Sequence, residues 1–262
     1  MKKQPKYDTN LAMGLGLIEE TKILLNAWSP PTDATGLNRQ VLESGMLPNV
    51  SAYRLRNIVV RCFAPRYLGS DGKPACYLKR LLSVLASSEI TQLFFLYTCR
   101  ANRILADFVR GVYWEKYESA SELVTRDDAQ GFIRRAIDDG KTPSRWAEGQ
   151  IKRVGRYLTG CCADYGLLGK RTSTGRYIVP YRIEPKVAAY LAHDLHFSGL
   201  GDNAVTSHPD WQLFGMMKDD VREEFRRLSL KGHFILQSAG DITHIGWKHK
   251  HMEEFVDVLA QG

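Results

Sequence analysis

Residues 144–182, SRWAEGQIKRVGRYLTGCCADYGLLGKRTSTGRYIVPYR, place the pattern of an amphipathic helix directly before that of a β-hairpin. On a helical wheel one apolar stripe joins Ile151, Val154, Leu158, Cys161, Cys162 and Tyr165. The opposite arc holds Arg145, Lys152, Arg153 and Arg156, together with Gly149 and Gly160. Two short strands then flank a Ser-Thr-Gly turn. This pattern predicts a helix anchored by one face, with a basic face turned outward and a hairpin beside it.

The charge of this segment is strongly one-sided. Eight Lys and Arg residues stand against Glu148 and Asp164, a net +6 in a chain whose formal net charge is +7. Scattered cations serve solubility in many proteins, whereas clustered ones favour an anionic partner. A solvated basic helix face beside a basic loop explains the sign of the charge. It does not explain two glycines in the basic arc, because glycine costs roughly 1 kcal/mol relative to Ala inside a helix.

Helical periodicity dominates the chain up to about residue 166, and the hairpins are short. We therefore predict a mainly α protein with small β-hairpins. The segment RDDAQGFIRRAIDD forms a helix closing at Gly140, a second helix is capped by Ser144, and the hairpin follows. Helix, turn, helix and hairpin in this order are typical of a winged helix-turn-helix.

A second helix-turn-helix pattern lies near the N-terminus. Asp33 can cap a helix that reaches Ser44, with Gly45 just past its end, and Ser51 can cap a further helix that ends before Pro65. The predicted organisation has four parts: an N-terminal helix-turn-helix (9–68), a central helical block (74–122), the winged helix-turn-helix (125–184) and a C-terminal α+β region (185–262). In the last part, a hairpin is expected around residues 239–241.

The apolar segment 81–99 resembles a membrane span, but Glu89 and several Ser, Thr and Gln residues interrupt it. A carboxylate there would cost several kcal/mol in lipid. We predict instead two buried helices with a break near Ser87.

Five cysteines without a C-x-x-C pair favour small core residues over a disulfide framework, and no signal peptide is visible. We therefore expect a cytoplasmic protein.

No pattern of catalysis or metal binding is apparent. The seven histidines lack a carboxylate or cysteine at a spacing that completes a tetrahedral set. MGLGL (13–17) lacks the G-x-G-x-x-G extension of a nucleotide fingerprint. We expect no enzyme activity, no metal and no cofactor.

The pattern favours nucleic-acid binding by the basic helix and the hairpin after it. One face of a recognition helix anchors it, and the other presents Arg and Lys to phosphates and base edges. The predicted binding residues are Arg145, Gly149, Lys152, Arg153, Arg156, Lys170, Arg171 and Arg176, with a flexible glycine-containing tip on the hairpin. Arg54 and Arg61 of the N-terminal helix form a secondary candidate.

Five longer segments carry a further signal: NLAMGLGLIEET, SEITQLFFLYTCRANRILADFVRGVYWEKY, WAEGQIKRVGRYLTGCCADYGLL, PDWQLFG and ITHIGWKHKHMEEF. Together they resemble the BrxA family of bacteriophage-exclusion (BREX) defence systems. The resemblance rests on order and spacing over nearly the whole chain. It implies a non-enzymatic, helix-rich protein with winged-helix elements that binds double-stranded DNA and works with other BREX components.

Two alternatives stay open at this point. The family has been likened to a NusB-type RNA-binding fold, so RNA is a second candidate ligand. A structural adaptor whose basic face meets an acidic protein is the third. Sequence specificity, oligomeric state and the defence component it contacts do not follow from the chain.

Overall fold

The computed structural model describes residues 6–9, 11, 16–69, 71–239 and 242–261. Helices dominate, and the strands form small antiparallel sheets, so the predicted mainly α fold class is confirmed. The chain divides into two compact units. The first unit comprises residues 1–76 and 94–181, and the second comprises residues 77–93 and 182–262. The division into four domains that the sequence predicts stays a prediction.

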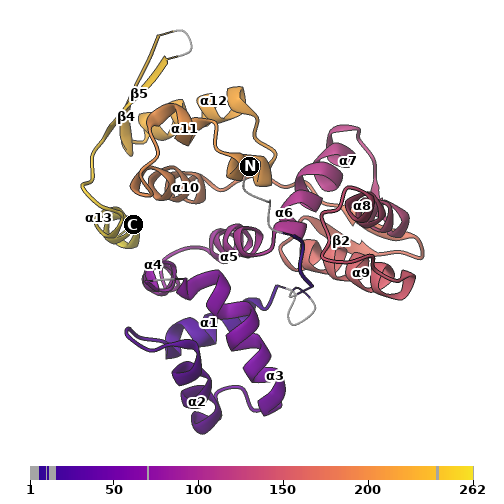
Figure 1. The fold of residues 1–262 in the computed structure, drawn as a ribbon. Helices are drawn as coiled ribbons and strands as arrows, with labels where there is room; N and C mark the ends of the chain where they lie inside the picture. The colour runs from indigo at the N-terminus through magenta and orange to yellow at the C-terminus, as the bar shows by residue number, and fades with distance from the viewer. Residues whose placement is uncertain (1–5, 10, 12–15, 70, 240–241, 262) are drawn as a thin grey trace. The chain divides into compact units, whose positions relative to one another are not determined.

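Helices form most of the first unit (Figure 1). Its N-terminal helices are α1 (Ile18–Ala27), α2 (Ala34–Ser44), α3 (Ala52–Asn57) and the π-helix η2 (Ile58–Leu68), followed by the start of α4 (Lys73–Leu81). As predicted, the Asp33 side chain caps α2 by accepting from Gly36 N–H, and Gly45 ends it with φ 64°. The helix capped by Ser51 does not end before Pro65 but runs on to Leu68. The wide turns of a π-helix accommodate a residue that lacks N–H.

The central helices follow in the order α5 (Ser87–Ala101), α6 (Arg103–Phe108), the π-helix η3 (Val109–Tyr113) and α7 (Trp114–Glu118). The predicted break near Ser87 is confirmed, because α4 ends at Leu81 and α5 begins at Ser87. Among the helices that the structure describes, none is long and apolar enough to cross a membrane.

The rest of the first unit has two helices and three strands: β1 (Leu123–Thr125), α8 (Arg126–Asp138), α9 (Glu148–Asp164), β2 (Leu168–Arg171) and β3 (Gly175–Ile178). β3 lies between β1 and β2, antiparallel to both. β1 was not predicted, because its three residues are too few to show an alternating pattern. Figure 1 shows α8 and α9 beside this small sheet.

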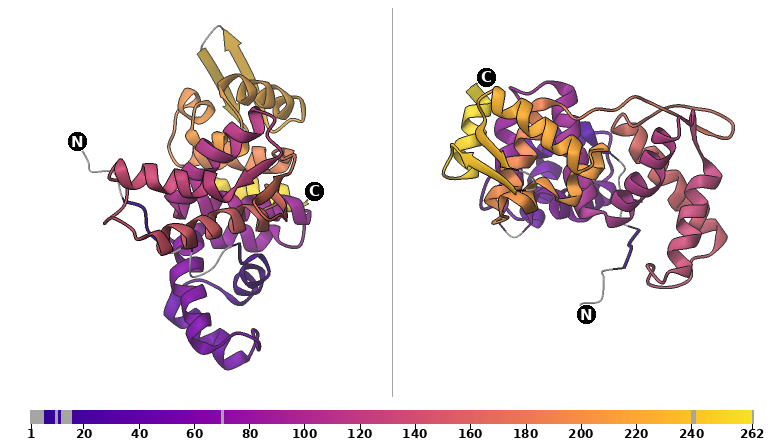
Figure 2. Two further views of the ribbon diagram at one scale, coloured as in Figure 1. Left: turned by 90° about the vertical axis from the view of Figure 1, so that its right-hand side faces the viewer. Right: turned by 90° about the horizontal axis from the view of Figure 1, so that it is seen from above.

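The second unit contains α10 (Pro185–Phe197), α11 (Asp202–Thr206), the 3-10 helix η4 (Pro209–Phe214), α12 (Lys218–Leu230), β4 (Phe234–Ala239), β5 (Ile242–Trp247) and α13 (Met252–Gln261). The predicted second hairpin is present, although its turn at 240–241 lies outside the described residues. In Figure 2 this hairpin lies beside α11 and α12 of the same unit. Trp211, Phe225, Phe234 and Phe255 are among the large buried side chains of its core.

Candidate nucleic-acid interface

The apolar stripe of α9 is buried as predicted. Its six members, Ile151, Val154, Leu158, Cys161, Cys162 and Tyr165, are each at most 3% exposed. Lys152, Arg153 and Arg156 on the other side of the helix are exposed. Burial of one face therefore fixes which way the cations of α9 point.

Helix α9 begins later than predicted. Ala147 rather than Ser144 is its N-cap, and the helix covers Glu148–Asp164. Trp146 is only 6% exposed, so the segment before α9 packs against the core and does not extend the helix. Arg145 consequently lies in the exposed loop before the helix, not on its basic face.

Helix α8 packs against α9 at Gly155. A Cβ atom at Gly155 would lie 3.5 Å from Ala129 Cβ and 3.7 Å from Ile133 Cδ1, which is ordinary van der Waals contact. At the start of α8, Thr125 and Asp128 form a capping box. Partial burial opposes ionisation of Asp128, but hydrogen bonds from Thr125 and the nearby Lys116 ammonium hold the pKa of that carboxyl below its usual value. The helix that faces α9 is thus firmly anchored at its N-terminus.

The small sheet depends on a close approach at Gly175. Gly175 pairs with Thr125, and a methyl group on it would overlap the carbonyl oxygen of Val124 and lie 2.8 Å from Thr125 Cα. The predicted role of this glycine as a flexible tip is therefore wrong: it is a buried strand residue. The turn before it is held by Thr172, whose hydroxyl accepts from Gly175 N–H at 3.0 Å and from Thr174 N–H at 3.3 Å.

The hairpin places two cations opposite each other. Arg171 on β2 pairs with Arg176 on β3. The Arg176 guanidinium donates to the carbonyl oxygen of Gly169 at 3.1 Å, while Arg171 is exposed. Directly opposed like charges destabilise a hairpin unless an anion lies near them.

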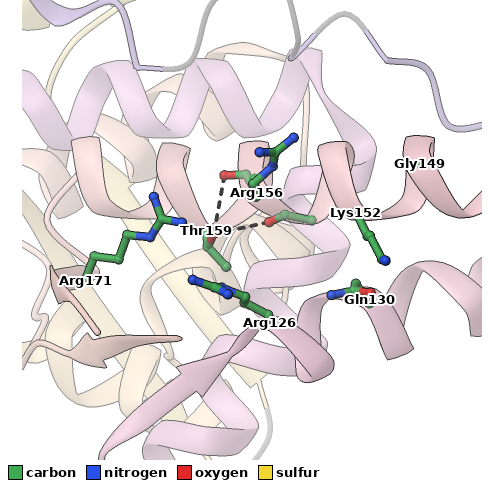
Figure 3. A pocket seen from close by; sticks show the side chains of 8 residues that line it. Arg126, Gln130, Gly149, Lys152, Arg156, Thr159 and Arg171 are labelled. Carbon is green, nitrogen blue, oxygen red and sulfur yellow. Dashed lines mark hydrogen bonds between the residues drawn. The ribbon is translucent and has the colours of Figure 1, made fainter. Parts of the chain in front are cut away.

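A cavity of about 520 Å³ opens between α8, α9 and β2. Four cations line it: Arg126 from α8, Lys152 and Arg156 from α9, and Arg171 from β2. The remaining lining residues are uncharged, namely Gln130, Gly149, Gly155 and Thr159. Figure 3 shows Arg126 and Arg171 pointing toward Thr159, and Lys152 pointing toward Gln130.

The two acids of residues 144–182 are engaged elsewhere. Arg134 Nη2 donates to Glu148 Oε2 at 2.9 Å, and this hydrogen bond lowers the pKa of the Glu148 carboxyl. Asp164 accepts from Gly16 N–H at 2.9 Å. Within the part of the chain that the structure describes, none of the four cavity cations forms an ion pair. Lys152 also interacts electrostatically with Glu148, but no carboxylate among the described residues is paired with any of the four cations.

The cavity brings together part of the predicted site. Gly149, Lys152, Arg156 and Arg171 line it, and the structure adds Arg126, Gln130 and Thr159, which sequence reasoning missed. Arg145, Arg153, Lys170, Arg176, Arg54 and Arg61 do not line it. The sequence does place Arg126 at the start of the helix before α9. It was not predicted as a binding residue, because Asp127 and Asp128 follow it directly and balance its charge in the sequence.

One glycine of the basic arc is not exposed. Gly160 is buried beside the fully buried Cys161 and Cys162. The segment at Gly16 crosses this end of α9, where Tyr165 Oη donates to Gly16 O at 3.0 Å. The wheel therefore places the apolar stripe of α9 correctly along its length and is wrong about the exposure of Gly160. Gly149 remains open, because a methyl group added to it would meet no atom within 4 Å.

The cysteines and histidines are further candidate sites. Burial raises the pKa of the Cys161 thiol to about 12, so it stays protonated. Cys62, Cys99 and Cys162 are likewise buried, as predicted for core residues, whereas Cys76 is only half-buried. Among the described residues, no group of three or more His, Cys, Asp or Glu side chains is arranged to hold a metal ion. Most of the MGLGL segment (13–17) lies outside the described residues.

Fold and site together define a helix-rich protein with a basic helix–hairpin face that surrounds a cationic cavity. The family model BrxA matches residues 5–194, well over half of the chain. The chain therefore belongs to the BrxA family, which makes it a component of a BREX phage-defence system.

Comparison with solved structures shows a similar fold in an uncharacterized protein from Magnetospirillum magneticum. The TM-score is 0.55 at 16% sequence identity, and the alignment covers 73% of this chain and 95% of that one. At this identity the likeness concerns the fold alone. No curated protein matches the chain.

Proposed function

We propose that this protein is a non-enzymatic, double-stranded DNA-binding component of its defence system. The single observation that carries the proposal is the cluster of exposed cations on α9, on the β2–β3 hairpin and at the first residue of α8. Seven exposed cations, Arg126, Arg145, Lys152, Arg153, Arg156, Lys170 and Arg171, lie on these elements or next to them and form no ion pair among the described residues. DNA presents the phosphates that such a face requires.

The topology supports the same proposal. Helices α6 and α7, strand β1, helices α8 and α9, and strands β2 and β3 follow one another in the order of a winged helix, with the sheet order β1-β3-β2. In that interpretation α9 is the recognition helix and the β2–β3 hairpin is the wing. The buried stripe of α9 anchors it, and its exposed N-terminal half is free to enter a major groove.

Fluorescence anisotropy with a labelled duplex of about 30 base pairs, across about 50 to 200 mM salt, tests this function. If six cations contact phosphates, log Kobs should fall against log salt with a slope of about −5. The variant Lys152→Ala/Arg153→Ala/Arg156→Ala should reduce the slope to about −3 and weaken binding strongly. Lys231→Ala/Lys248→Ala/Lys250→Ala removes the same charge from exposed residues of the second unit and serves as the matched control.

The outcomes separate the competing functions. Loss of binding in the α9 variant alone, with unchanged circular dichroism, supports the proposal. A structured RNA that outcompetes the duplex would favour RNA, because the A-form major groove excludes a recognition helix. Absence of binding to either nucleic acid would contradict the proposal and favour an adaptor that meets an acidic protein.

A further inference from the structure

The basic face is hollow rather than flat. The cavity of about 520 Å³ lies within the range of small-ligand sites, about 300 to 1,000 Å³. A single phosphodiester crossing the surface of a helix does not need a hollow of this size. The volume is instead suited to a compact anion with several phosphate groups.

The wall of the cavity has the chemistry of a phosphate site. Arg126, Lys152, Arg156 and Arg171 come from three different elements, so they face a bound anion from several sides. Guanidinium groups bind phosphate through paired, charge-assisted hydrogen bonds, and an ammonium group contributes a mobile point charge. Gln130 adds neutral polar atoms, and no carboxylate lines the cavity to repel an anion.

The arrangement of charges on the hairpin also favours a bound anion. Arg171 lies opposite Arg176 across the two strands, although like charges at such positions repel. Gly169 O partly satisfies Arg176, but Arg171 extends to the cavity and forms no ion pair among the described residues. An anion seated in the cavity would remove the repulsion that the unbound protein retains.

We propose that this cavity is a phosphate-binding site that accepts a free polyphosphate as well as a phosphodiester of DNA, so that the two ligands compete. The competition rests on the proposed function, whereas the binding of polyphosphate does not. A polyphosphate in the cavity neutralises the cations that DNA requires. The site thereby provides a way for a small phosphorylated molecule to regulate DNA binding.

Tripolyphosphate is the probe, and the full-length protein is titrated with it by isothermal calorimetry at low salt. Arg126→Gln should weaken its binding about tenfold, since it removes one charge-assisted phosphate contact. Arg135→Gln is the matched control, because it removes the same charge from an exposed position of α8 that does not line the cavity. Equal affinities of these two variants would overturn the proposal.

A second pair of variants places a charged or an uncharged side chain in the cavity, at a position chosen to leave the fold intact. Gly149 lines the cavity in the first turn of α9, where an added Cβ atom would meet no other atom within 4 Å. Gly149→Glu places a carboxylate there, which the helix N-terminus also stabilises. It should weaken tripolyphosphate binding about tenfold relative to Gly149→Gln, which has the same shape without the charge.

Competition is measured by displacing the labelled duplex with tripolyphosphate against sodium chloride of equal ionic strength. Stronger displacement by tripolyphosphate supports the proposal, and equal displacement overturns it. Binding of the duplex without any binding of tripolyphosphate would overturn this inference and leave the proposed function intact. Arg126-dependent binding of tripolyphosphate without any duplex binding would support the phosphate site and contradict the DNA-binding function.

Discussion

Arg171 and Arg176 face each other across the β2–β3 hairpin, and neither forms an ion pair with an acid among the described residues. Such a pair weakens the unbound hairpin and strengthens its attraction for an anion. The same residue therefore has opposite effects on stability and on binding, and the two effects can be measured separately.

Arg171→Gln should stabilise the unbound protein and weaken its binding to DNA. Removing the repulsion from Arg176 should raise the free energy of unfolding by about 0.2 to 1 kcal/mol at low salt. The gain should fade at about 1 M salt, where screening is strong. Urea denaturation at both salt concentrations measures stability, and anisotropy measures duplex affinity. A loss of stability at low salt would contradict the assigned repulsion.

Gly175→Ala should disrupt the pairing of β1 with β3. The added methyl group overlaps Val124 O, so the strands must separate or the backbone must shift. We expect a decrease of about 2 to 4 kcal/mol in the free energy of unfolding, measured by urea denaturation. A decrease below about 0.5 kcal/mol, the size of an ordinary surface change, would show that the strands are not this close.

Gly149→Ala should have the opposite effect on stability. The methyl group enters open space, and alanine is favoured over glycine in a helix by up to about 1 kcal/mol. Because the residue lines the cavity, we expect duplex affinity to fall at least about threefold, or 0.7 kcal/mol. Thermal denaturation and anisotropy check the two effects. Unchanged affinity would mean that the glycine is not needed for close approach of DNA.

His193 should make the second unit sensitive to acid. Its ring is fully buried and stacks on Phe255 with 3.6 Å between ring centroids, and its Nδ1 donates to Ala189 O at 2.8 Å. That hydrogen bond places the proton of the neutral ring on Nδ1, and Nε2 has no hydrogen-bond partner among the described residues. Burial lowers the pKa of His193 from 6.5 to about 3.

The sign of the pH dependence follows from this shift. Above pH 6.5 the contribution of His193 to stability is fully present, and it is lost progressively as the pH falls from 6.5 toward 3, because the unfolded chain binds a proton that the folded one resists. At pH 5 the loss is about 2 kcal/mol. Burial also lowers the pKa of His196 and His233, so every variant should lose some stability in acid. Urea denaturation at pH 8 and pH 5 should show a loss about 2 kcal/mol larger in the wild type and in the exposed-histidine control His251→Gln than in His193→Phe. Equal acid sensitivity of the two variants would contradict the assignment.

Local patterns in the chain predicted several elements well. Asp33 and Gly45 bound a helix as expected, since capping depends only on residues within one turn. The apolar stripe of α9 and the exposure of Lys152, Arg153 and Arg156 followed from helical spacing alone. The BrxA family likewise follows from the sequence itself.

Only the tertiary structure decided what surrounds these residues. It brought Arg126 next to Arg171, which lies on a strand far along the chain, and it drew Glu148 away to Arg134. It also buried Gly160 and turned Gly175 from a presumed flexible tip into a tightly packed strand residue. A helical wheel gives the angle of a side chain about its own axis. It does not show which other segment of the chain packs there, and that packing forms the cavity and leaves its cations unpaired.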